Sequence, residues 1–123
     1  MRPLPTALAF ALLCAATAVP AFEPVDNCAT VLGSLSVELR IARDLPPGKR
    51  SSYFCAKRYT TLVGASRERV VRSLGPPDRT GTEGGWSYFF ASRHGPLEPG
   101  TTELVFRFDG AGQVDAVDCH RTA

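Results

Sequence analysis

The side chains of this chain that are capable of chemistry are few and widely spaced. Its two histidines are His94, in a segment rich in glycine and proline, and His120, near the C-terminus. No nucleophile elbow, H-E-x-x-H pair or phosphate-binding glycine loop occurs near either of them. The carboxylates Glu83, Glu98 and Glu103 show no spacing that is typical of an acid–base pair. We therefore expect no catalytic residues.

The sequence also predicts no metal site and no cofactor. Its four cysteines include no C-x-x-C pair, and His120 directly follows Cys119, a spacing that is unsuited to chelation. Residues 109–115 have some features of a calcium loop, but they lack oxygen ligands at alternate positions and a closing glutamate. They are better interpreted as a tight turn.

The first 21 residues are typical of a secretory leader. A basic N-terminus (Met1-Arg2), an apolar run and the small residues of Val19-Pro20-Ala21 follow in the expected order. We predict cleavage after Ala21 and a location in the periplasm or outside the cell. Cys14 follows Leu13, whereas lipoprotein signals require a small residue there, so Cys14 is predicted to be an ordinary leader residue without a lipid anchor.

The charge of the remaining chain excludes one class of partner. Arg2 is the only charged residue of the leader, so the 14 basic and 12 acidic residues of the whole chain become 13 and 12. Proteins that bind nucleic acid need a basic patch or stripe, and this balanced composition does not indicate one.

Cysteine pairing is the next constraint, because three cysteines follow the leader. In an oxidising compartment we expect one disulfide and one remaining thiol. Cys55–Cys119 is favoured, since a helix that contains Cys55 should pack on the strand that ends near Cys119. Such a bond closes a loop of about 60 residues and stabilises the fold by roughly 4 kcal/mol. Cys28–Cys55 is the alternative pairing.

The N-terminal half of the mature chain is predicted to be helical. Residues 22–50 form an extra N-terminal element; residues 28–45 fit both helical and strand periodicity, and length together with the Asp26-Asn27 cap favours a helix. The main domain, residues 51–123, begins with a short helix from Ser51 or Ser52 to Leu62. A further helix over residues 66–74 has a serine cap, an apolar stripe of Val70, Val71 and Leu74, and Gly75 as its stop.

The C-terminal half alternates as strands do. Strands are predicted over residues 86–91, 104–108 and 113–119, joined by a loop at 92–102 and a turn at 109–112. The result is an α+β fold with two or three short helices on one face of a three-stranded antiparallel meander. The predicted core consists of Tyr59, Leu62, Val70, Leu74, Trp86, Tyr88, Phe106 and Phe108. The predicted contact surface consists of Phe89 and Val105 on the other sheet face and Arg93 and His94 in the loop.

The order of these motifs resembles a known family. Leu62-x-Gly64-Ala65-Ser66, Leu74-Gly75-x-Pro77, Trp86-x-Tyr88 and Leu104-x-Phe106-x-Phe108-Asp109-x-x-Gly112 are similar to the SmpA/OmlA (BamE-like) outer-membrane assembly lipoproteins, over about residues 53–117. The resemblance implies the helix-helix-three-strand fold of β-lactamase inhibitory proteins. It also implies non-catalytic contacts with envelope proteins or lipid head groups.

Three hypotheses about function follow. The first is an exported, non-catalytic binding module that contacts envelope proteins, as in outer-membrane protein assembly or envelope maintenance. An inhibitor-like module that docks on an exported enzyme is the second. A small thiol-dependent enzyme that uses Cys55 or the remaining unpaired thiol is the third and least favoured, because exported cysteines usually pair.

Overall fold

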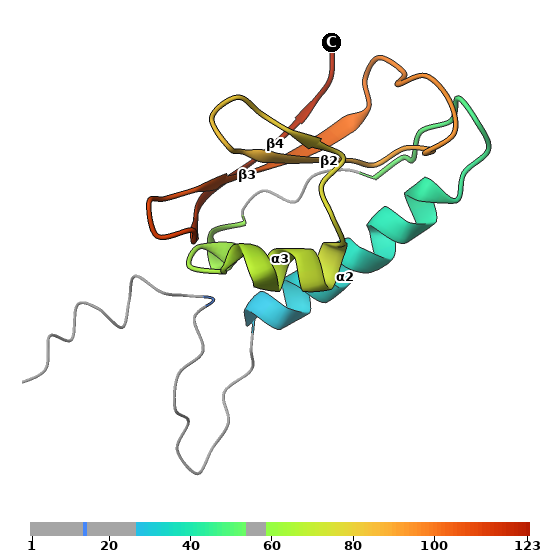
Figure 1. Cartoon of the computed structure of the whole chain (residues 1–123). Helices are drawn as coiled ribbons and strands as arrows, with labels where there is room; N and C mark the ends of the chain where they lie inside the picture. The colour runs from blue at the N-terminus through green and yellow to red at the C-terminus, as the bar shows by residue number, and fades with distance from the viewer. Residues whose placement is uncertain (1–13, 15–26, 54–58) are drawn as a thin grey trace, which may run out of the picture.

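The computed structural model describes Cys14, residues 27–53 and residues 59–123, and residues 1–13, 15–26 and 54–58 lie outside the described part. Within these described residues, two α-helices and a short 3-10 turn precede a four-stranded sheet, as Figure 1 shows. The elements are α2 (Asn27–Arg43), η1 (Thr60–Leu62), α3 (Arg67–Leu74), β1 (Arg79–Thr80), β2 (Trp86–Phe89), β3 (Thr102–Phe108) and β4 (Val114–Arg121). The fold is therefore α+β, as predicted.

The segment after residue 27, which fits both helical and strand periodicity, forms the helix α2. Its buried residues recur at the helical spacing and are Cys28, Leu32, Leu35, Leu39 and Ala42. Val37 and Ile41, which fit the strand-like alternation of the same segment, lie on the outer side of the helix and are 49% and 56% exposed. An amphipathic helix needs only one apolar stripe to be buried, and here the helical stripe faces the core.

Helix α3 begins and ends at the predicted residues. The Ser66 hydroxyl accepts a hydrogen bond from the Arg69 amide at 3.1 Å, which caps the N-terminus. Gly75 follows the helix with a φ of 82°, and its amide donates to the Val71 carbonyl at 2.7 Å. The predicted stripe was wrong at one position, because Val70 and Leu74 are buried whereas Val71 lies at the helix surface.

The helix predicted from residue 51 to residue 62 is not present over its described parts. Only η1 at residues 60–62 is helical, and residues 51–53 have no helical structure, while residues 54–58 lie outside the described range. The backbone of residues 51–53 is instead hydrogen-bonded to residues at the ends of β2 and β3. The Ser51 amide donates to the Phe90 carbonyl, and the Thr102 hydroxyl donates to the Tyr53 carbonyl at 2.9 Å. The Tyr53 ring also stacks on Phe90 at 4.3 Å.

The sheet has four strands in the order β1-β2-β3-β4, all antiparallel, where three were predicted. The additional strand, β1, is only two residues long and pairs Arg79 with Ser87 and Thr80 with Trp86. Two exposed residues carry no hydrophobic alternation, so no periodicity indicated a strand there. Asp78 extends this edge, because its carboxylate accepts a hydrogen bond from the Phe89 amide at 2.8 Å.

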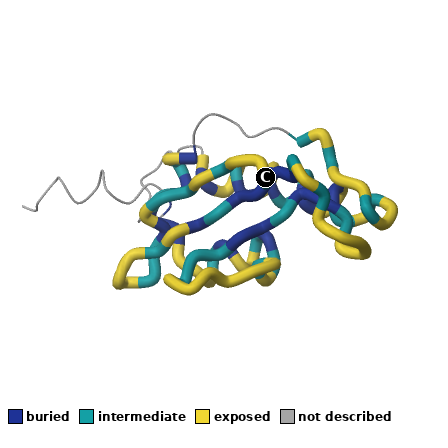
Figure 2. The backbone as a smooth tube through the Cα atoms, turned by 90° about the horizontal axis from the view of Figure 1, so that it is seen from above, coloured by how far each residue is buried: buried dark blue, intermediate teal, exposed yellow. Residues whose placement is uncertain are grey.

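The core lies between the sheet and the two helices, which lie next to each other on one side of the strands (Figure 1). Of the predicted core residues, Tyr59, Leu62, Val70, Leu74, Tyr88 and Phe106 are buried, and Trp86 and Phe108 are partly buried against them. Figure 2 shows buried backbone along the central strands and exposed backbone in the connecting loops. The Tyr88 hydroxyl donates to the Gly75 carbonyl at 2.8 Å, which links the sheet to the end of α3.

Cys14, which the sequence assigned to the leader, is docked on this core. It forms a disulfide with Cys28 at the start of α2 and is 2% exposed. Its amide donates to the Val63 carbonyl at 3.0 Å, and its carbonyl accepts from Arg69. Because Cys28 is bonded to Cys14, the alternative pair Cys28–Cys55 does not form here. Cys119 is also disulfide-bonded, and its predicted partner Cys55 lies outside the described residues.

Removal of the leader is therefore expected to change the thiol chemistry of Cys28. The intact, oxidised chain should show no alkylation at this position, because the sulfur is bonded to Cys14. A chain that is cut after Ala21 before this disulfide forms lacks that partner and should be alkylated at Cys28 once it is unfolded. N-terminal sequencing and mass spectrometry of the exported protein measure both properties. An exported chain that retains Cys14 in its disulfide would contradict the predicted cleavage.

The long loop between β2 and β3 is fastened to the segment that follows α2. The Ser92 amide donates to the Lys49 carbonyl at 3.0 Å, and Arg50 Nη1 donates to the Pro99 carbonyl at 2.7 Å. A Cβ atom added at Gly95 would collide with the backbone nitrogen of Gly48 and would lie 3.1 Å from the carbonyl carbon of Pro47. Only glycine permits this backbone-to-backbone approach.

Gly95→Ala should therefore destabilise the protein, because neither backbone can move aside without shifting the loop. We expect the free energy of unfolding to fall by about 1–3 kcal/mol, as overpacking usually causes. Gly110→Ala is the matched control, since a Cβ atom at Gly110 meets nothing within 4 Å. Urea unfolding of both variants measures the difference, and equal stabilities would contradict this account of the loop.

Candidate binding surfaces

One face of the sheet is not covered by any described helix, and we call it the open sheet face. Strand alternation places on it the residues Arg79, Ser87, Phe89, Glu103, Val105, Arg107, Asp118 and His120. Val105 and Phe89, two residues of the predicted contact surface, are half-buried there. Arg79 lies over the Phe89 ring with its guanidinium carbon 5.1 Å from the ring centroid, which is a cation–π arrangement.

A network of four charged side chains crosses this face from β1 to β4. Glu103 lies at its centre with a side chain that is only 7% exposed. Its Oε2 atom accepts from Arg79 at 3.1 Å, and its Oε1 atom lies 3.0 Å from His120 Nε2. His120 Nδ1 lies 2.8 Å from Asp118 Oδ2. A buried carboxylate is tolerated when both oxygens are paired in this way.

The network favours the charged form of His120. The hydrogen bond to Asp118 raises the pKa of His120, partial burial opposes that shift, and Glu103 adds to it. Both ring nitrogens then act as donors to carboxylates. In this form the two carboxylates orient the ring, and the network holds its charges in place.

His120→Gln should remove a pH-dependent part of the stability. A raised histidine pKa stabilises the fold fully below the ordinary value of 6.5, and this contribution is lost as the pH rises through the raised value. The difference in unfolding free energy between wild type and variant should therefore be largest in mild acid and should shrink above neutrality. His94→Gln is the control, because the ring of His94 has no hydrogen bond to any described residue. Urea unfolding across this pH range provides the measurement, and parallel curves for His120→Gln and wild type would contradict it.

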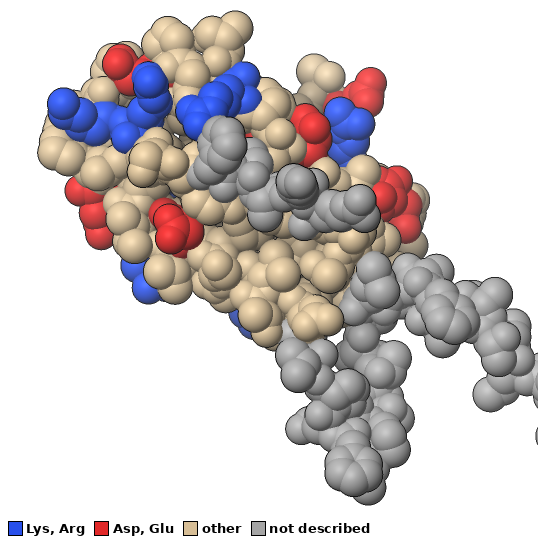
Figure 3. Space-filling view, turned by 180° about the vertical axis from the view of Figure 1, so that it is seen from behind, with Lys and Arg blue, Asp and Glu red and all other residues tan. Residues whose placement is uncertain are grey.

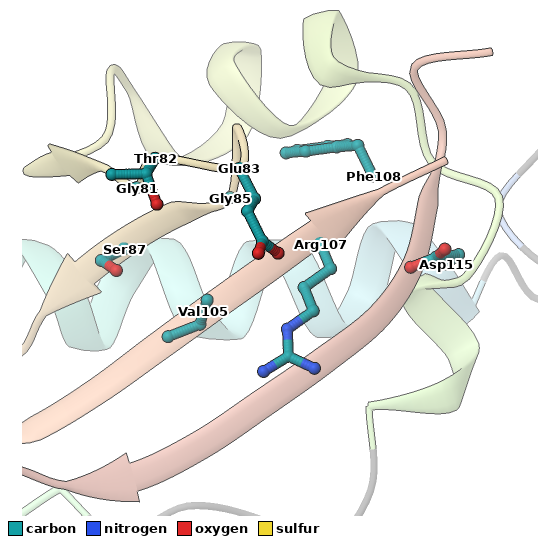
Figure 4. Close-up of a pocket in the computed structure, with 9 residues that line it drawn as sticks. All are labelled: Gly81, Thr82, Glu83, Gly85, Ser87, Val105, Arg107, Phe108 and Asp115. Carbon is teal, nitrogen blue, oxygen red and sulfur yellow. The ribbon is translucent and has the colours of Figure 1, made fainter. Parts of the chain in front are cut away.

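The open sheet face also has a hollow of about 370 Å³ beside the hairpin that joins β1 and β2. Figure 4 looks onto this hollow, with Thr82 and Glu83 from the hairpin, Arg107 from β3 and Asp115 from β4. The side chains of Glu83, Arg107 and Asp115 have no hydrogen-bond or ion-pair partner among the described residues. Their charges are therefore available to a partner.

A second concave surface, which we call the arginine groove, lies where the fastened loop meets the ends of both helices. It consists of two cavities of about 470 and 310 Å³ that share Arg43 and Arg93. The larger cavity is also lined by Arg40, Asp44 and His94. Thus the loop residues Arg93 and His94, which were predicted as contact residues, lie beside arginines of α2.

The smaller cavity of the arginine groove reaches the edge of the sheet. Phe89, Ala91 and Leu97 supply its apolar wall, and Leu97 is 47% exposed. Arg43 lines both cavities, and its Nη2 atom donates to Asp78 Oδ1 at 2.9 Å. Phe89 and Arg93 therefore line one cavity, whereas Val105 lies in the hollow of the open sheet face.

Several residues of these surfaces were not identified from the sequence. The pairing of Glu103 with Arg79 and His120 depends on the register of β1 to β4, and no local motif encodes it. Arg40 and Arg43 were read only as part of a helix whose periodicity was ambiguous. The alternation of strand residues could have indicated Glu103, because it places this side chain on the same sheet face as Val105.

Two other features are absent from the described part of the chain. There, no three His, Cys, Asp or Glu side chains are grouped to hold a metal ion. Among the same residues no helix has the length and apolar character needed to span a membrane. Basic and acidic side chains are interspersed on the face shown in Figure 3, in keeping with the small net charge.

No family model, no curated protein and no solved structure matches this chain. The fold and its surfaces define an α+β domain with helices on one side of the sheet and a charged, partly apolar face on the other. The resemblance to the BamE-like lipoproteins stays a prediction from the residues.

Proposed function

We propose that this protein is a non-catalytic binding module that recognises other proteins through the open sheet face. The observation that carries the proposal is the composition of that face, where half-buried Val105 and Phe89 are surrounded by oriented charges. Protein interfaces commonly combine an apolar centre with a polar rim. A sheet face without a helix over it meets either water or a partner.

The charges of this face support recognition in two ways. Arg79, Glu103, His120 and Asp118 are held by one another, so a partner that contacts them does not have to order them. Arg107, Glu83 and Asp115 are not paired within the described residues and are available to complementary charges. Electrostatic complementarity of this kind determines which partner binds and how fast.

The setting of the proposed function comes from the sequence. The leader indicates an exported protein, and the resemblance to BamE-like lipoproteins favours proteins of the cell envelope as partners. Outer-membrane protein assembly or envelope maintenance is the process in which such a module would take part.

Site-specific photocrosslinking in intact cells tests which surface binds. A photoreactive residue at Val105 should give defined adducts, because this side chain lies at the centre of the open sheet face. The same residue at Arg72, an exposed position of α3 without a described partner, is the matched control and should give none. Adducts at position 72 without adducts at 105 would refute the assignment of the surface.

The charges of the hollow are tested in the same experiment. Arg107→Glu should reduce the yield of adducts from position 105 by about tenfold, which corresponds to one lost charge-assisted contact. Arg72→Glu changes the net charge equally and should leave the yield unchanged. Mass spectrometry of the adducts identifies the partner: β-barrel assembly components support the envelope role, and a single exported enzyme supports inhibition instead.

A further inference from the structure

We propose that the arginine groove binds a segment of a partner polypeptide in which a carboxylate side chain stands next to an apolar one. This inference concerns a different surface from the hollow and the charge network of the open sheet face, which it meets only at Phe89. It rests on the contacts of Arg40, Arg43, Arg93, Phe89 and Leu97.

The charges that line the groove favour a single carboxylate. Three arginines and two aspartates line its two cavities, so the excess is one positive charge when His94 is neutral. Arg43 and Asp78 neutralise each other at 2.9 Å. The Arg93 guanidinium has no hydrogen-bond or ion-pair partner among the described residues. Arg40 has only a long contact of 3.4 Å with the Ser36 hydroxyl.

The helix ends explain part of this cluster but not all of it. Both α2 and α3 end at the groove, and the carbonyls of a helix C-terminus carry partial negative charge that basic residues compensate. Arg40 and Arg43, in the last turn of α2, serve that role. Arg93 comes from the loop, and its charge is left for a ligand. The nearby carbonyls also disfavour a doubly charged phosphate relative to a carboxylate.

The apolar wall of the groove sets a second property that the ligand must have, namely an apolar side chain. Phe89, Ala91 and Leu97 line the cavity that Arg93 shares, so an apolar side chain can be buried within reach of the guanidinium. Leu97 is 47% exposed although its loop is held at both ends by hydrogen bonds. A surface that joins an exposed apolar wall to an unpaired arginine suits a peptide better than a free inorganic ion.

The groove is also preformed. The contacts of Ser92 with Lys49 and of Arg50 with Pro99, together with the close approach of Gly95 to Gly48, fix the loop against the segment after α2. Binding therefore does not have to order the loop, and less of the interaction free energy is lost.

Selection from a pool of random peptides with the full chain tests the proposal. We expect enrichment of peptides with a glutamate or aspartate beside a leucine or another apolar residue. Arg93→Gln should abolish the enrichment, and Arg72→Gln, an exposed arginine of α3 outside the groove, should preserve it. An absence of enrichment, or enrichment of peptides without an acidic residue, would overturn the proposal.

The affinity of one enriched peptide for the protein and its variants makes the test quantitative. Arg93→Gln and a glutamine in place of the peptide's acid should each weaken binding by about tenfold or more. Added salt should weaken it further, since the contact is exposed. Competition by inorganic phosphate at equal concentration, or equal weakening by Arg72→Gln, would contradict carboxylate recognition. The crosslinks from Val105 do not depend on these variants, so the two proposals fail separately.

Discussion

Tyr88 joins the two layers of this protein, and the position of every surface depends on that junction. Its ring lies in the core edge-on to Phe106, with centroids 5.7 Å apart, and its hydroxyl donates to the Gly75 carbonyl where α3 ends. Burial raises the pKa of this hydroxyl, so it remains a neutral donor. The hydrogen bond thus ties a strand of the sheet to the residue that follows the last turn of α3.

Strand alternation then determines which residues lie on each of the two faces of the sheet. Once Tyr88, Leu104 and Phe106 face the helices, their neighbours Ser87, Glu103 and Val105 must face the other way. Glu103 is thereby placed in the middle of a sheet face, where an unpaired carboxylate would be costly. His120 lies opposite Glu103 on the neighbouring strand β4, and Arg79 reaches the carboxylate from β1, across β2, so that each oxygen has a partner. The open sheet face is consequently ordered before any partner arrives.

The arginine groove follows from a second set of contacts at the end of α2. The chain turns back after this helix, pairs Arg50 with Ala91 and holds the loop that carries Arg93. Residues separated by some fifty positions in the sequence, such as Arg43 and Arg93, thus line one concave surface together with apolar groups. The groove and the open sheet face are the two surfaces that we propose for binding.

Local patterns predicted those features that depend on neighbouring residues. The serine cap and glycine stop of α3, the alternation of β2 and β3, and the turn at residues 109–112 all have causes within a few positions, so the sequence alone specified them. Strand β1, the path of residues 50–53 and the Cys14–Cys28 disulfide have their causes in distant partners. The Glu103 network and the arginine groove belong to the same class. Only the tertiary structure decided them, because register and loop packing bring together side chains that no short-range periodicity relates.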